Sequence, residues 1–488
     1  MYKRQVLWNS GAKTNDFTAY RSLGSYKIAH TVRQAGYSAQ VIDHVNLMSR
    51  EDLFQCTTKF IDANTKILGI STTFLVEDHI LPPNLISILN SFNTLYPNLE
   101  IVFGGYSVMS SKVFLKYLNK KNVSIIPGYG EDIFLDLLHW KAGKGTKPFI
   151  DLNDRHNRIN EYKTAINTLY NIECDNFKFT DQDCILPNET LPIEISRGCI
   201  FKCKFCNHLN LGRKKLDYLR DFELVKEEML HNYAKWGTTN YYIICDTFND
   251  TEYKMKAWYD MVNSLPFKIK YTAYLRADLL DKFPDVPYML KDTGLFTGFH
   301  GIESLGREAS TIIGKGWSGK SAREFIPKLY HDIWKDEVHQ TLSFIVGLPG
   351  DTRESILDMM AWFKDNDLYH QAVHMLGIYK AALNRHPSEF DLNTEKYGFS
   401  FPDETDPTYW ETGYWNSNQV VEFIKTDINP IWKDISAPHG SWQIMMMLQY
   451  NIDPSLFKKD LSRWIDIDDL KIKRKAMIQN YISKLLAL

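Results

Sequence analysis

The sequence predicts an α/β protein with two successive series of alternating strands and helices, followed by a helical extension. In residues 4–142 short apolar runs alternate with amphipathic stretches, and the alternation returns from Leu191 and stops near residue 385. The 488 residues are 44% hydrophobic and 24% charged, as in ordinary globular proteins, and are enough for about three domains. We therefore expect units at 1–142, 143–188, 189–385 and 386–488.

The first series predicts a Rossmann-like, doubly wound parallel sheet. Its strands are expected at residues 5–8, 39–42, 67–71, 101–103 and 123–126, with helical patterns between them. Alternation of this kind gives parallel strands covered by helices on both faces, and ligands of such sheets bind at the carboxyl ends of the strands.

Small and polar residues follow these strands. A single glycine in such a loop is more often a simple tight turn, but several on one sheet edge let the backbone approach a large ligand closely and predict a binding edge. The candidate residues are Asn9, Ser10, Ser71, Thr72, Thr73, Gly104, Gly105, Tyr106, Gly128, Gly130 and Glu131.

Residues 143–188 are polar, with glycine and proline at the start, and we expect a linker or small subdomain there. The second series has strand-like runs at 191–195, 241–245, 269–275, 296–302, 341–346 and 374–379. Helical spacing from Phe222 to Trp236 stops at Gly237, as a helix with a glycine C-cap does. Six such units predict a complete or partial (β/α) barrel, whose chemistry lies at the carboxyl ends of the strands.

Three cysteines directly follow the first strand of this second series. Cys199, Cys203 and Cys206 have CxxxCxxC spacing, and thiolates on one loop suit iron–sulfur clusters, zinc or copper(I). Three thiolates are one short of the usual four ligands, so something other than protein can occupy the remaining position.

The extension from 386 to 488 loses the alternation and is rich in aromatic residues. Helices are expected at 420–428 and 470–486. Either a cap that packs on the barrel or a lid that lines a substrate pocket fits this composition. The basic run at 471–475 is better explained as a solvated helix face than as an RNA contact.

A CxxxCxxC loop after the first strand of a (β/α) series resembles the radical S-adenosylmethionine (SAM) superfamily. The resemblance implies a [4Fe–4S] cluster on the three cysteines, with the amino and carboxylate groups of SAM on the fourth iron. Reductive cleavage of SAM would then release a 5′-deoxyadenosyl radical. A zinc knuckle would need a fourth ligand at zinc spacing, and His208 is too close to Cys206 for that role.

Later strand ends support this resemblance. Asp246 and Asn249 match the position that binds the methionyl amino group, and Glu303 with Ser304 resembles the ribose-contacting GxES element. Arg276 suits the SAM carboxylate, and Gly347 lies in an element that packs on adenine. Phe205, with Phe201, would shield the cluster from water. Helix capping or a surface ion pair is the alternative for Asp246 and Glu303; the sequence points to no catalytic residue.

The first unit together with the barrel resembles the cobalamin-binding-domain subgroup of that superfamily. The loops at Ser71 and Gly104 look like those around the cobalamin nucleotide tail, but the DxHxxG element with its cobalt-ligating histidine is absent, and the loop at 20–25 reads YRSLGS. The resemblance implies cobalamin-dependent methylation of an unactivated carbon. Alternatives are a cobalamin-independent radical rearrangement, cyclisation or dehydrogenation, and a non-catalytic cobalamin or redox sensor.

The net charge and the sequence at the amino terminus limit the partners that we expect. A net charge of −2 creates no global field toward nucleic acid or an anionic membrane, and no apolar run approaches the roughly 20 residues of a membrane helix. The amino terminus has no apolar signal region, and clustered thiols favour a reducing cytoplasm. We expect an external one-electron reductant of the flavodoxin or ferredoxin type and a small-molecule or peptidic substrate.

Overall fold

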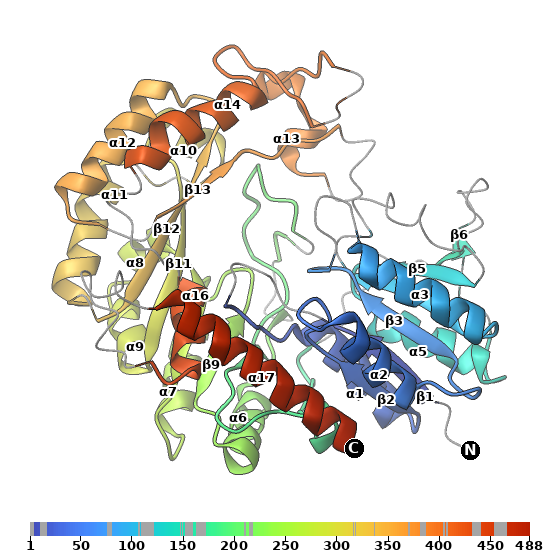
Figure 1. The fold of residues 1–488 in the computed structure, drawn as a ribbon. Helices are drawn as coiled ribbons and strands as arrows, with labels where there is room; N and C mark the ends of the chain where they lie inside the picture. The colour runs from blue at the N-terminus through green and yellow to red at the C-terminus, as the bar shows by residue number, and fades with distance from the viewer. Residues whose placement is uncertain are drawn as a thin grey trace.

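The computed structural model describes most of the chain, namely residues 4–9, 17–75, 81–105, 108, 122–146, 148, 150–151, 160–162, 172–208, 211–213, 218–315, 317, 319–335, 337–368, 371–380, 387–403, 406, 408–431, 441–452 and 466–488. Two sheets lie beside each other, and the C-terminal helix crosses from one to the other (Figure 1).

The first sheet has the order β2-β1-β3-β4-β5-β7-β6 and is parallel except for its last pair. The order 2-1-3-4-5 is that of a doubly wound sheet, so the predicted Rossmann-like unit is confirmed. Its strands are β1 (Arg4–Trp8), β2 (Ser38–Ile42), β3 (Ile67–Ser71), β4 (Glu100–Gly105), β5 (Val123–Pro127), β6 (Ile150–Asp151) and β7 (Asn160–Tyr162). Its helices are α1 (Leu23–Gln34), α2 (Arg50–Phe60), α3 (Pro83–Leu95) and α5 (Glu131–Lys141).

The second sheet is a parallel, open barrel of six strands in the order of the chain, with β8 and β13 at its edges. This arrangement confirms the partial (β/α)6 barrel. Its strands are β8 (Leu191–Glu194), β9 (Asn240–Ile244), β10 (Lys270–Arg276), β11 (Leu295–Glu303), β12 (His339–Val346) and β13 (Gln371–Met375). Its helices are α6 (Phe222–Trp236), α7 (Glu252–Asn263), α8 (Ala277–Lys282), α9 (Val286–Asp292), α10 (Arg307–Ile312), α11 (Gly319–Pro327) with a π-helical turn (Lys328–Ile333), and α12 (Arg353–Asp365).

Two details differ from the sequence expectation. The last barrel strand covers Gln371–Met375 instead of 374–379, because its partner β12 ends at Val346 and the chain turns at Gly347 (φ 100°). The ladder therefore closes with the hydrogen bond from Leu376 N–H to the Val346 carbonyl at 2.9 Å. The segment expected as a linker also contributes β6 and β7, which pair with each other and extend the first sheet beyond β5.

The extension is helical, as expected, and it packs on both sheets. Its elements are α13 (Glu389–Leu392), a 3-10 turn (Glu395–Tyr397), α14 (Ser417–Phe423) with a π-helical turn (Ile424–Ile428), α16 (Ser441–Gln449) and α17 (Ile467–Ala487). Trp410 and Trp415 are buried in the core beneath α12, as a cap on the barrel would be. Helix α16 packs against β10, β11 and β12, and α17 packs against α2 of the first unit (Figure 1).

No helix in the described part of the chain is long and apolar enough to cross a membrane.

Tyr481 fixes helix α17 to the first sheet. Its hydroxyl accepts a hydrogen bond of 2.8 Å from the backbone N–H of Asp43, and both residues are fully buried. Tyr481→Phe leaves that N–H without its partner, which costs about 1–3 kcal/mol of unfolding free energy. The shift in the urea unfolding midpoint measures this cost. Ile472→Ala, on the exposed side of the same helix, should change the stability by less than about 0.5 kcal/mol; an equal effect of both substitutions would contradict the assignment.

Candidate functional site

The three cysteines lie on a loop at the carboxyl end of β8, where a (β/α) barrel carries its chemistry. Cys199 is buried, and Cys203 and Cys206 are half-buried. The Cys199 sulfur lies 3.4 Å from the Thr247 hydroxyl after β9, and the Cys203 sulfur accepts a hydrogen bond of 3.3 Å from Arg276, the last residue of β10. The loop is therefore held against the carboxyl ends of the next two strands.

The described part of the loop carries three cysteine sulfurs as possible metal ligands. Within the described ranges, no three His, Cys, Asp or Glu side chains lie close enough together to hold a single metal ion. A closed structural zinc site needs four ligands, whereas an iron–sulfur cluster can leave one iron to another molecule. Burial raises the pKa of Cys199, and it raises the pKa of Cys206 to about 12. Loading therefore releases protons, because the ligand form is the thiolate.

Asp246 lies directly beside the cysteine loop. Its carboxylate accepts a hydrogen bond of 3.1 Å from the backbone N–H of Gly198 and lies 3.3 Å from the His208 ring nitrogen. Burial raises the pKa of this carboxyl group. The acid thus adjoins the cysteine loop directly, and an ammonium group that approached it would find a partly buried carboxylate.

Arg276 and Asn249 are hydrogen-bonded to neighbouring residues of the chain. The Arg276 guanidinium forms two hydrogen bonds with Asp278, at 3.0 and 2.7 Å, and its centre lies 3.9 Å from the centroid of the Phe201 ring. The Asn249 amide both donates to and accepts from the backbone of Arg276, at 2.9 and 2.8 Å. Asn249 therefore positions Arg276, and Arg276 contacts the cysteine loop itself. Direct contact of either side chain with SAM stays a prediction.

Glu303 closes β11 in a left-handed conformation (φ 68°), which is unusual for a residue with a side chain. The Lys315 ammonium holds its carboxylate at 3.1 Å and also contacts the carbonyl of Gly301. The neighbouring Ser304 hydroxyl donates to the buried carboxyl group of Asp351 at 2.9 Å. The ends of β11 and β12 are thereby tied together around Glu303.

Two further predicted residues pack into the protein core. Gly347 has φ 100°, and a Cβ atom there would lie 2.7 Å from the ring of Trp410, so this glycine permits the close approach of the C-terminal extension. Phe205 is half-buried and packs against the same core cluster.

The predicted residues of the first sheet lie along one edge, at the carboxyl ends of β1, β3, β4 and β5. Thr72 donates from its N–H and its hydroxyl to the carbonyl of Gly104, both at 2.8 Å, and Gly128 N–H donates to the carbonyl of Gly105 at 3.1 Å. Gly105 has φ 100°, and a Cβ there would lie 2.6 Å from the Thr73 hydroxyl. The structure brings together Asn9, Ser71, Thr72, Thr73, Gly104, Gly105, Gly128, Gly130 and Glu131; Ser10 and Tyr106 lie outside the described residues.

Glu131, at the same edge, also binds the entry of the cysteine loop. It accepts a hydrogen bond of 2.8 Å from Arg197, which also binds Glu194 at the end of β8. The carboxyl edges of the two sheets therefore meet here. Burial alone would raise the pKa of Glu194, but Arg197 and Lys27 hold it at about 2.

Sequence reasoning missed Arg197, Thr247 and Lys315. Arg197 precedes Gly198 and Cys199 directly, so its place beside the motif was a usable signal. Lys315 reaches Glu303 from beyond α10, and Thr247 reaches Cys199 from another strand end, and no local spacing indicates either contact.

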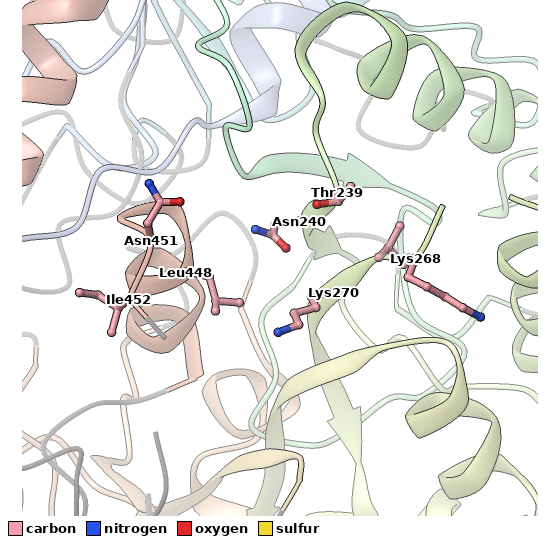
Figure 2. A pocket seen from close by; sticks show the side chains of 8 residues that line it. Thr239, Asn240, Lys268, Lys270, Leu448, Asn451 and Ile452 are labelled. Atoms are coloured by element: carbon pink, nitrogen blue, oxygen red, sulfur yellow. The ribbon is translucent and has the colours of Figure 1, made fainter. Parts of the chain in front are cut away.

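An open pocket of about 440 Å³ lies at the opposite end of the barrel (Figure 2). It is lined by Asn240 and Lys270, which begin β9 and β10, and by Leu448 and Asn451 from the extension. This is the amino-terminal face, which in (β/α) barrels serves stability, so we do not place the chemistry there.

Comparisons with known proteins agree with this geometry. Residues 193–363 match the family model of the radical SAM superfamily. A relative named uncharacterized methyltransferase PH0819, from Pyrococcus horikoshii, is 26% identical over 174 residues. That match covers 36% of this chain and 36% of the relative's own length.

Two solved structures share the fold over most of both chains. The radical SAM methyltransferase TsrM from Kitasatospora setae, with cobalamin and a [4Fe-4S] cluster bound, has a TM-score of 0.61 and 15% identity, covering 82% of this chain and 76% of its own. The cobalamin-dependent radical enzyme OxsB, with aqua-cobalamin and SAM bound, has a TM-score of 0.62 and 14% identity, covering 100% of this chain and 80% of its own.

The buried carboxyl group of Asp351 makes the unfolding free energy of the protein depend on pH. Burial raises the pKa of its carboxyl group to about 6, from an ordinary value of 3.8. The protonated form is thus favoured by folding, and this contribution is complete below the ordinary value and lost as the pH rises through about 6. Asp351→Asn removes the ionisation but keeps an acceptor for Ser304.

The unfolding free energy of Asp351→Asn, relative to the unmodified chain, should therefore rise between about pH 4 and about pH 6, by at most about 3 kcal/mol. Urea unfolding of both proteins across this range measures the difference. A difference that stays constant with pH would show that Asp351 keeps its ordinary pKa.

Proposed function

We propose that this chain, whose residues 193–363 form a radical SAM domain, is a radical SAM enzyme that methylates an unactivated carbon with the help of cobalamin. The observation that carries the proposal is the loop with three thiols, held at the barrel end whose strand ends also carry Asp246 and Glu303. Three thiols together with a half-buried and a buried carboxylate suit a cluster and a ligand with an amino group and sugar hydroxyls.

Cys199, Cys203 and Cys206 would hold a [4Fe–4S] cluster, which when bound supplies the electron that cleaves SAM. Asp246 would accept from the SAM amino group, because its carboxylate is beside the loop and partly buried. Glu303, fixed by Lys315, would accept from the ribose hydroxyls. Phe201, beneath Arg276, would exclude water from the thiols.

The edge of the first sheet would hold cobalamin, which when bound supplies the methyl group. Its glycines lie at the carboxyl ends of parallel strands, where ligands of such sheets bind, and the fold is shared with TsrM and OxsB, both described with cobalamin bound. Because Glu131 joins this edge to the cysteine loop, a substrate between the two edges would be within reach of both cofactors. An external one-electron reductant and a small-molecule or peptidic substrate complete the reaction, which we place in the cytoplasm.

Loss of one thiol should abolish the radical chemistry. After anaerobic reconstitution, Cys203→Ala should contain no cluster iron or sulfide. With dithionite as the reductant, it should release no 5′-deoxyadenosine from SAM. Cys174→Ala is the matched control, because Cys174 is exposed and remote in sequence from the loop, and it should retain both. If Cys203→Ala still released 5′-deoxyadenosine, the cluster assignment would be wrong.

Cobalamin binding separates methylation from the other radical reactions. Protein reconstituted with hydroxocobalamin and passed through a desalting column should retain the corrin, read from its visible spectrum. Retention is expected because this edge carries glycine and threonine loops at the carboxyl ends of neighbouring parallel strands, where ligands of such sheets bind. Cleavage of SAM without corrin retention would instead favour a cobalamin-independent rearrangement, cyclisation or dehydrogenation, and corrin retention without SAM cleavage would favour a sensor.

A further inference from the structure

Arg197 is bound by both sheets at once. Its guanidinium donates to Glu131 of the first sheet at 2.8 Å and to the two carboxylate oxygens of Glu194 at 2.8 and 3.0 Å. Its centre lies 4.6 Å from the centroid of the Tyr129 ring. The side chains of Arg197, Glu131 and Glu194 are at most 9% exposed, so these bonds form in a water-poor environment where they fix geometry strongly.

Hydrogen bonds hold the backbone in place between Arg197 and Cys199. The Arg197 N–H donates to the carbonyl of Tyr218 at 3.0 Å, and the next N–H, of Gly198, donates to Asp246 at 3.1 Å. Gly198 has φ 110°, a conformation that glycine adopts freely, and Cys199 follows it and is buried. A displacement of Arg197 must therefore move Cys199 or break these bonds.

We propose that Arg197 is a positioning residue for the cysteine loop, and that Glu131 makes the placement of Cys199 depend on the docking of the first sheet. The inference rests on the proposed function in one respect, that the three thiols hold a cluster. The inference goes beyond the proposed function because it gives the first sheet a role in the cluster site that does not require cobalamin.

The planar guanidinium is the feature that matters. It reaches three carboxylate oxygens on two elements, and a lysine ammonium cannot reproduce that fork. Arg197→Lys therefore keeps the charge near the cluster while removing the geometry. If this substitution changes the EPR spectrum or the potential of the cluster, the cause is the position of the cysteine loop and not a change in net charge.

The test uses full-length protein, anaerobically reconstituted with iron and sulfide and free of cobalamin. Arg197→Lys should retain the iron content, change the electron paramagnetic resonance (EPR) spectrum of the reduced cluster and shift its midpoint potential. The rate of 5′-deoxyadenosine release should fall by about 10- to 100-fold, as for other residues that orient metal ligands. Glu131→Ala, which removes the acceptor that the first unit offers to Arg197, should change the same EPR features and keeps the test available if Arg197→Lys does not fold.

Arg33→Lys is the matched control. Arg33 also joins the first unit to the segment before the barrel, through Asp183 at 2.9 Å, and its other bonds go to Ala39 and Thr180. The Arg33→Lys variant should leave the EPR spectrum and the midpoint potential of the cluster unchanged. Unchanged spectra and potentials in both Arg197→Lys and Glu131→Ala would overturn the proposal, as would equal changes in Arg33→Lys. If the unmodified protein held no cluster at all, the proposed function would fail first, so the two failures are distinguishable.

Discussion

Buried ion pairs between the two sheets fix the arrangement on which the candidate site depends. Arg21 binds Glu189 at 2.5 Å, Lys27 binds Glu194 at 3.2 Å, and Arg197 binds Glu131 at 2.8 Å, each with little or no exposure to water. Because burying charges is costly, such pairs are weak evidence for stability, but an unpaired buried charge is costlier still. Misplacement of one sheet against the other would leave several charges unpaired, so we attribute the precise docking to these pairs.

The docking of the two sheets matters because each sheet carries its candidate binding loops at the carboxyl ends of its strands. Parallel strands place their carboxyl ends together, so the cysteine loop after β8 and the glycine loops after β4 and β5 each lie at the functional end of their own sheet. The contact of Glu131 with Arg197 brings these two ends into one region. Two cofactors and a substrate in one region is what the proposed reaction requires.

The sequence predicts both sheets, because apolar runs and helical spacing are local patterns. It also predicts the cysteine loop and most edge residues, because strand ends follow from strand positions. It does not predict the contacts that span the chain. Examples are the hydrogen bonds of Arg197 with Glu131 and of Arg276 with Cys203, and the approach of Trp410 to Gly347, which is more than 60 residues away in sequence. No local period encodes such pairings, since tertiary packing decides them.

The most direct test of the account is the magnetic interaction between the two cofactors. EPR spectra would be recorded on protein that holds both the reduced cluster and cob(II)alamin, and compared with spectra of protein that holds each alone. If the two carboxyl edges face one another, the doubly loaded spectrum should show spin–spin broadening or splitting of both signals. A spectrum equal to the sum of the two separate ones, with both cofactors present at full occupancy, would contradict the central claim that the edges form one site.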